Sequence, residues 1–159
     1  FMIFSFNIFS QELSKGMKAP DFTLQDENGK KVTLSKVYKK SPVVIFFYPR
    51  AMTSGCTKQA CGIRDNFSEF EKNNIKVFGI STDSTNKLKE FVKKENLNFP
   101  LLSDVDKKVS ENYGVLRESG MAKRVTFIID KKGIVSEIIE VKDIDNHAEL
   151  VLRLAKELK

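Results

Sequence analysis

Alternating apolar and polar positions near the start of the chain have the pattern of a β-hairpin. Residues 21–25 and 31–34 alternate, and Asn28 and Gly29 lie in the short turn between them. An Asn-Gly pair between two alternating runs is a strong hairpin signal. Ser35 follows the second run and is expected to cap a short helix that ends at Tyr38.

The run VVIFFY at residues 43–48 is continuously apolar, which predicts a central strand covered on both faces. Apolar residues then recur at helical spacing, and one helix is expected to bury Ala60, Ile63, Phe67 and Phe70. Residues 76–80 predict the next strand. A second helix follows, with its apolar face formed by Leu88, Phe91 and Val92.

The remaining pattern predicts a short strand at 99–102, a short helix at 107–112 and a hairpin formed by 124–129 and 134–141. A last helix is expected to start near Asp145 or Asn146 and to bury Val151, Leu154, Ala155 and Leu158. Strands that alternate with helices predict an α/β fold with helices on both faces of a sheet. The order is that of a thioredoxin-like fold with an N-terminal β-hairpin and a central insertion. We therefore expect a single domain over residues 16–159.

Residues 1–15 differ from this domain, because the first ten are apolar and carry no charge. They have the composition of the apolar part of an export signal, or of an apolar arm or edge strand that packs on the domain. The first interpretation makes the protein exported or periplasmic, and the second makes it cytoplasmic. No apolar run reaches the roughly 18 residues of a membrane span.

Composition excludes several further classes. With two cysteines and one histidine in 159 residues, the chain is neither a disulfide scaffold nor a structural zinc fold. The net charge of +6 comes largely from lysine pairs scattered along the chain. Nucleic-acid binders usually concentrate their charge on one face, so the pairs indicate a solvated surface and no nucleic-acid partner.

Cys56 lies where the central strand has ended and a helix begins. Free N–H groups and the positive end of the helix dipole stabilise a thiolate at such a position. Cys56 also continues the apolar stripe of the helix, so it has a second interpretation as core filler. Both cysteines fall within six residues, and polar residues precede the helix, which favours a reactive thiol.

Pro49, Thr53 and Cys56 have the spacing Pro-x-x-x-Thr-x-x-Cys, which resembles the active-site motif of the peroxiredoxin family. Residues 55–65, with Cys61 five positions after Cys56, resemble the bacterioferritin-comigratory-protein (Q) subgroup. Arg124 resembles the active-site arginine of the family, and residues 16–24 resemble its N-terminal signature. The departures are Arg50, Ala51, Met52 and Ser54 in the loop, and Gln59 at a position that is often Glu.

The resemblance implies an atypical two-cysteine, thioredoxin-dependent peroxidase that reduces hydrogen peroxide and organic hydroperoxides. The Cys56 thiolate attacks the peroxide and becomes a sulfenic acid, Thr53 holds the peroxide, and Arg124 stabilises the negative charges. Pro49 shields the pocket. Cys61 then forms an intramolecular disulfide, which thioredoxin or a similar dithiol reduces. No cofactor and no metal are implied, and a monomer is expected.

Two other functions use the same residues. Cys56, Cys61 and His147 have the chemistry of copper ligands, which makes a copper carrier one alternative. A disulfide oxidoreductase is another, although such enzymes usually have two residues between their cysteines. His147 itself is expected on the surface. Asp83 and Ser84 are expected to cap a helix and not to form a catalytic pair.

Overall fold

The computed structural model describes residues 13–158. Within them, seven strands form one sheet in the order β2-β1-β5-β4-β3-β6-β7. The strands are β1 (Thr23–Asp26), β2 (Lys31–Thr33), β3 (Val43–Phe47), β4 (Lys76–Ser81), β5 (Leu101–Ser103), β6 (Val125–Ile129) and β7 (Val135–Glu140). The helices are α1 (Leu34–Tyr38), α2 (Ser54–Asp65), α3 (Phe67–Lys72), α4 (Thr85–Glu95), α5 (Lys108–Asn112) and α6 (His147–Lys156).

Strand β3 lies inside the sheet, as its apolar run predicts. It pairs in parallel with β4 and antiparallel with β6, and its residues are almost fully buried. Successive side chains of a strand point to opposite faces. Val44 and Phe46 therefore pack in one core, while Val43, Ile45 and Phe47 pack in the other.

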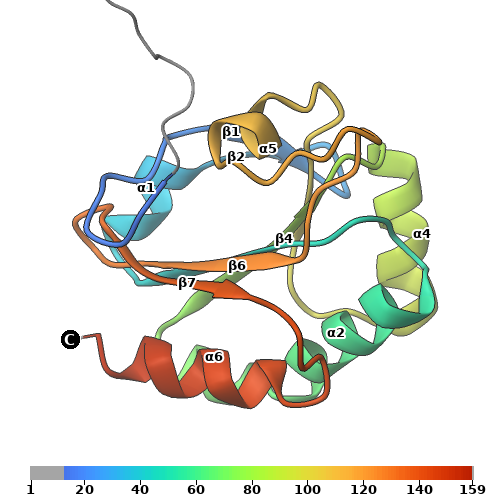
Figure 1. The fold of residues 1–159 in the computed structure, drawn as a ribbon. Helices are drawn as coiled ribbons and strands as arrows, with labels where there is room; N and C mark the ends of the chain where they lie inside the picture. The colour runs from blue at the N-terminus through green and yellow to red at the C-terminus, as the bar shows by residue number, and fades with distance from the viewer. Residues whose placement is uncertain (1–12, 159) are drawn as a thin grey trace, which may run out of the picture.

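Helices cover both faces of the sheet, so the expected α/β architecture is confirmed (Figure 1). Helices α2 and α6 lie on one side, and α1 and α5 lie on the other. The core under α2 and α6 contains residues such as Ile63, Phe70, Leu88 and Val151. The opposite core contains Leu34, Tyr38, Val109 and Tyr113. Together these layers bring the end of β3 and the start of α2 to the same edge of the molecule.

Two local predictions about helices are wrong in detail. The single helix expected through Phe70 is divided at Asn66, whose side chain donates to the Gly62 carbonyl at 2.8 Å. An Asn side chain that bonds to nearby backbone competes with the helical pattern, which accounts for the break. Ser35 is not a cap, because α1 starts one residue earlier, and the Ser35 N–H donates to the Asp21 carboxylate.

The last helix differs from its prediction at both ends. Leu154 and Leu158 are only partly buried, while Val151 and Ala155 are fully buried. His147, expected on the surface, is 2% exposed. The first turn of α6 covers β6, so the His147 Nε2 shares a 2.8 Å hydrogen bond with the Thr126 hydroxyl. Burial, together with the positive charge of Arg124, lowers the His147 pKa to about 4, so the ring is neutral at pH 7.

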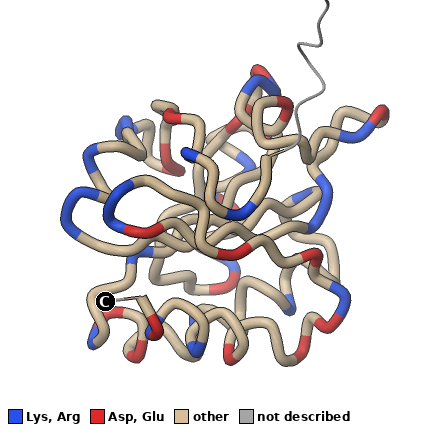
Figure 2. The backbone as a smooth tube through the Cα atoms, turned by 60° about the vertical axis from the view of Figure 1, so that its left-hand side comes forward, with Lys and Arg blue, Asp and Glu red and all other residues tan. Residues whose placement is uncertain are grey.

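Charged residues of both signs are spread over the surface (Figure 2). The ion pairs within residues 13–158 join Lys15 to Glu137, Lys58 to Asp145 and Arg64 to Asp65. Exposed pairs of this kind contribute at most about 1 kcal/mol each. None of the helices in the described range combines the length and apolar character that a bilayer-crossing segment needs. Most of the predicted arm or export signal, residues 1–12, lies outside the described part.

Candidate active site

Cys56 lies in the first turn of α2 and is 1% exposed. Thr53 precedes the helix in an extended conformation, and its carbonyl accepts the first helical hydrogen bond from the Thr57 N–H at 2.8 Å. The N–H groups of the first helical turn have no carbonyl partner within the helix. The sulfur therefore lies at the positive end of the α2 dipole, where a negative charge is stabilised.

Arg124 reaches this sulfur from the other half of the chain. Register pairs Phe47 with Val125, which places Arg124 beside the carboxyl end of β3. Its Nη2 donates to the Cys56 Sγ at 3.4 Å, and its Nη1 donates to the Gln59 Oε1 at 2.6 Å. The Arg124 guanidinium thus contacts the side chains of Cys56 and Gln59, both in α2. Hydrogen bonds from a charged donor are stronger than those between neutral groups.

Gln59 was noted in the sequence only as a departure from the family motif, and its contact with Arg124 was not expected. It lies three positions after Cys56, so both side chains share one face of α2. Its side chain is 1% exposed, and its Nε2 has no partner among the described residues. Because the carboxamide is neutral, it orients Arg124 without cancelling its charge. The helical spacing was the signal that could have identified it.

Gly55, part of the motif at residues 55–65, has a contact role that the sequence analysis did not give it. A Cβ built on it would lie 3.2 Å from the Arg124 Nη2. That distance is shorter than most real Cβ contacts, so a larger residue would push the guanidinium away from Cys56. The absence of a side chain at position 55 lets Arg124 lie directly against the start of α2.

The loop between β3 and α2 is held by the turn between β4 and α4. The Ala51 N–H donates to the Asp83 carboxylate at 2.7 Å, and the Ser81 hydroxyl donates to the same oxygen at 2.7 Å. Asp83 was expected to cap α4 and does not, whereas the Ser84 hydroxyl does accept from the Lys87 N–H. Asp83 instead fixes the position of the loop that precedes Cys56.

Thr53 and Pro49 flank this loop. The Thr53 hydroxyl donates to the Arg50 carbonyl at 3.0 Å and makes no capping hydrogen bond to α2. It is exposed, and Pro49 is partly buried. Met52, just before Thr53, has a φ of 66°, an uncommon conformation for a side chain of its size. The polar edge of the site is therefore a tightly bent loop with an accessible hydroxyl.

Cys61 lies in the same helix as Cys56, and both are free thiols. The Cys61 thiol donates to the Glu95 carboxylate at 3.6 Å, and Arg64 donates to the Glu95 main-chain carbonyl. Partial burial raises the pKa of the Cys61 thiol, the positive charge of Arg64 offsets part of this, and the Glu95 carboxylate raises the pKa again. Cys61 is thus kept as a neutral thiol against α4.

The copper-ligand set of the alternative interpretation is not assembled. Within residues 13–158, no three His, Cys, Asp or Glu side chains are grouped so that they could hold a metal ion. The Nε2 of His147 is paired with Thr126. What the structure does gather around Cys56 is a helix start and a guanidinium.

Sequence comparison agrees with this geometry. A sequence model of the AhpC/TSA family matches residues 15–138. The chain belongs to this family, whose thiol peroxidases are the peroxiredoxins. It is 44% identical over 152 residues to Peroxiredoxin Bcp of Escherichia coli K12, covering 91% of this chain and 97% of that protein. The identity to chloroplastic Peroxiredoxin Q of rice (Oryza sativa subsp. japonica) is 46% over 129 residues, covering 80% and 59%.

Solved structures lead to the same subgroup. The crystal structure of peroxidoxin BcpB from Mycobacterium tuberculosis superposes with a TM-score of 0.87 at 37% identity and covers 93% of this chain and 99% of that one. The expected thioredoxin-like fold is confirmed. The chain is thus a thiol peroxidase of the bacterioferritin-comigratory-protein (Q) subgroup, as the motif around Cys56 indicates.

Proposed function

We propose that Cys56 is the peroxidatic residue, that Cys61 resolves its sulfenic acid, and that a thioredoxin-type dithiol completes the cycle. The observation that carries the assignment is the Arg124 guanidinium, which donates to the buried Cys56 Sγ and to Gln59 together. The Cys61 thiol instead donates to the Glu95 carboxylate, although the positive charge of Arg64 also acts on it. Cys56 therefore accepts a hydrogen bond from a cation, whereas Cys61 donates one to an anion.

In the first step, the Cys56 thiolate attacks the terminal oxygen of the hydroperoxide. An S–O bond forms as the O–O bond breaks, leaving Cys56 as sulfenic acid and releasing an alkoxide or hydroxide that takes a proton from solvent. Negative charge moves from sulfur to the departing oxygen. Arg124 has five N–H donors and faces both positions, so it stabilises the charge throughout. Thr53 turns its hydroxyl from the Arg50 carbonyl to the peroxide.

In the second step, the Cys61 sulfur attacks the sulfenic sulfur of Cys56. The S–S bond forms, and the sulfenic oxygen leaves as water with the proton of the Cys61 thiol. Both cysteines belong to one helix, so the disulfide is intramolecular, and a monomer is sufficient for the whole cycle. An external dithiol then exchanges with the disulfide, becomes oxidised and restores both thiols.

Loss of the arginine tests the assignment of Cys56. Arg124→Gln is expected to lower the second-order rate constant for peroxide by about 10²- to 10³-fold, the usual cost of a donor that stabilises developing charge. Arg153→Gln, an exposed arginine on α6, is the matched control and should react like the wild type. Stopped-flow peroxide consumption measures both. An Arg124→Gln enzyme as fast as the control would contradict the proposal.

The two cysteines are separated by their products. Cys56→Ser should abolish peroxide reduction, while Cys61→Ser should consume one equivalent and stop at the sulfenic acid or oxidise further. Turnover with thioredoxin, thioredoxin reductase and NADPH tests the reductant. Wild-type turnover by Cys61→Ser in that assay would show that Cys61 is not the resolving residue.

A further inference from the structure

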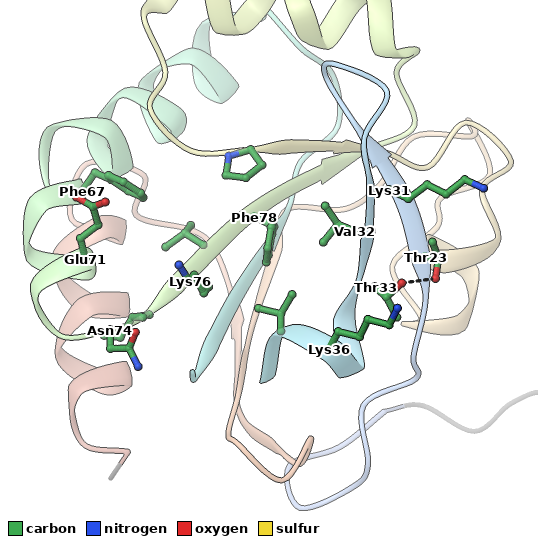
Figure 3. Close-up of a pocket in the computed structure, with 14 residues that line it drawn as sticks. Thr23, Lys31, Val32, Thr33, Lys36, Phe67, Glu71, Asn74, Lys76 and Phe78 are labelled. Atoms are coloured by element: carbon green, nitrogen blue, oxygen red, sulfur yellow. Dashed lines mark hydrogen bonds between the residues drawn. The ribbon is translucent and has the colours of Figure 1, made fainter. Parts of the chain in front are cut away.

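A cavity of about 720 Å³ opens between the N-terminal hairpin and β4, and neither cysteine lines it. Figure 3 shows its residues, with Val32 and Lys36 on the side of the hairpin and α1, and Lys76 and Phe78 on the side of β4. Ligand pockets commonly enclose about 300 to 1,000 Å³. The cavity is therefore large enough for a small molecule and is separate from the peroxide site.

The cavity exists because strand β5 is short. Pairing between β4 and β5 begins at Gly79 and Leu101, where the Gly79 N–H donates to the Pro100 carbonyl. Alternate residues of a strand direct their main-chain groups to the same neighbour, so Val77 faces the side of β5 as well. Pro100 has no N–H to offer it. Val77 pairs with Val44 of β3, but the pairing of β4 with β5 does not extend to Val77, and the sheet opens at this point.

Apolar side chains form slightly more than half of the cavity wall. Val32 and Val37 contribute from the hairpin and α1, and Ile75, Val77 and Phe78 contribute from β4 and the turn before it. Val32 and Val37 are only partly buried, so apolar surface is left open to solvent. Covering such surface with an apolar ligand is favourable by about 25 cal/mol for each Å² removed from water.

The charges on the cavity are mostly positive. Lys31, Lys36 and Lys76 line it, against the single acidic residue Glu71. All four side chains are exposed, and none of the ion pairs within residues 13–158 includes them. Three ammonium groups without carboxylate partners, beside an apolar wall, complement a molecule that is apolar along its length and negative at one end.

We propose that this cavity binds an anionic amphiphile with a single alkyl chain, such as a medium-chain carboxylate. The chain lies against Val32, Val37 and Phe78, and the anionic head interacts with Lys31, Lys36 and Lys76. A neutral alkane leaves the lysines unused, and a small inorganic anion leaves the apolar walls uncovered. The combination of both surfaces in one cavity selects the amphiphile.

Decanoate below its micellar concentration is the probe, measured by isothermal titration calorimetry on the reduced full chain. Saturable binding of one decanoate per protein is expected, with weaker binding of decanol and none of decyltrimethylammonium or acetate. The double variant Lys36→Gln/Lys76→Gln should bind decanoate about tenfold more weakly, because two favourable charge interactions are lost. The matched control Lys89→Gln/Lys93→Gln, on the exposed face of α4, should bind like the wild type.

A second variant tests the apolar wall independently of charge. Val37→Trp places a large side chain in the cavity and should abolish decanoate binding, while peroxidase activity shows that the variant is folded. The proposal is overturned if decanoate does not bind at millimolar concentration. It is also overturned if decanol binds as tightly as decanoate, or if the control variant Lys89→Gln/Lys93→Gln loses as much affinity as Lys36→Gln/Lys76→Gln.

Discussion

Replacing Gly62 by alanine is expected to slow formation of the Cys56–Cys61 disulfide, because α2 must unwind before the two sulfurs can meet. Both cysteines lie within α2. Five residues of regular helix correspond to about 7.5 Å of rise and about 140° of rotation. On a cylinder of radius about 2.3 Å, the Cα atoms are then about 8.7 Å apart. A disulfide requires less than about 7 Å and converging Cβ atoms, so the intact helix cannot accept one.

The substitution changes the unwinding equilibrium by a known amount. Gly in a helix interior is about 1 kcal/mol less favourable than Ala. A Cβ at position 62 would lie 3.8 Å from the Ala148 Cβ, an ordinary contact, so the folded state accepts it without strain. Gly62→Ala therefore lowers the unwound population about fivefold, since 1.4 kcal/mol corresponds to a factor of ten. The rate of disulfide formation should fall by the same factor.

The assay mixes reduced protein with one equivalent of hydrogen peroxide and traps the remaining sulfenic acid with dimedone at successive times. Gly62→Ala should show sulfenic acid that persists about five times longer, and more oxidation to sulfinic acid at high peroxide. Asn86→Ala, an exposed substitution in α4, raises helix propensity elsewhere and serves as the control. Its sulfenic acid should decay at the wild-type rate.

Hydrogen exchange supplies a second measurement. Amide exchange over residues 54–64 should accelerate when the disulfide forms, while β3 stays protected. The reasoning fails if Gly62→Ala closes its disulfide as fast as the wild type. It also fails if a protein shown to contain the disulfide keeps the helix fully protected.

Three further changes probe other parts of the molecule. His147 has a folded pKa of about 4 against an ordinary value of 6.5, so the folded state binds fewer protons than the unfolded state between these values. The free energy of unfolding should therefore fall by about 3 kcal/mol as pH drops from 6.5 to 4. Urea titrations should show a smaller fall over this pH range for His147→Gln. Glu95→Gln should lower the pKa of the Cys61 thiol, seen as faster sulfenic acid decay at neutral pH, whereas an unchanged pH profile would contradict the role of Glu95. Gly79→Ala would place a Cβ 2.8 Å from the Phe46 ring, which should cost about 1–3 kcal/mol in urea unfolding.

Much of the fold could be predicted because the pattern of apolar residues is local. The run at residues 43–48 identified the central strand, and the turn with Asn28 and Gly29 identified the first hairpin. The break at Asn66 could not be predicted in the same way, since it depends on one side chain that bonds to the Gly62 carbonyl. Burial of His147 depends on how α6 lies over β6, which periodicity within α6 does not report.

In the candidate site, too, local features could be predicted from the sequence and long-range contacts could not. Cys56 was found from its place between a strand and a helix, but the part played by Arg124 was indicated only by the family motif. Its contact with Cys56 depends on the register of β6 against β3. The partnership of Gln59 with Arg124 and the contact between Cys61 and Glu95 join segments far apart in the chain. A local sequence pattern cannot predict such contacts.

The distance along the chain between Cys56 and Arg124 has a consequence for synthesis. The hydrogen-bonded pair is separated by 68 residues, and the arginine is placed only when β6 pairs with β3. A ribosome that adds 5–20 residues per second needs about 3 to 14 s to make that stretch. During this interval Cys56 lacks its contact with the Arg124 guanidinium. The hydrogen bond from Arg124 to Cys56 is therefore completed only when the sheet closes.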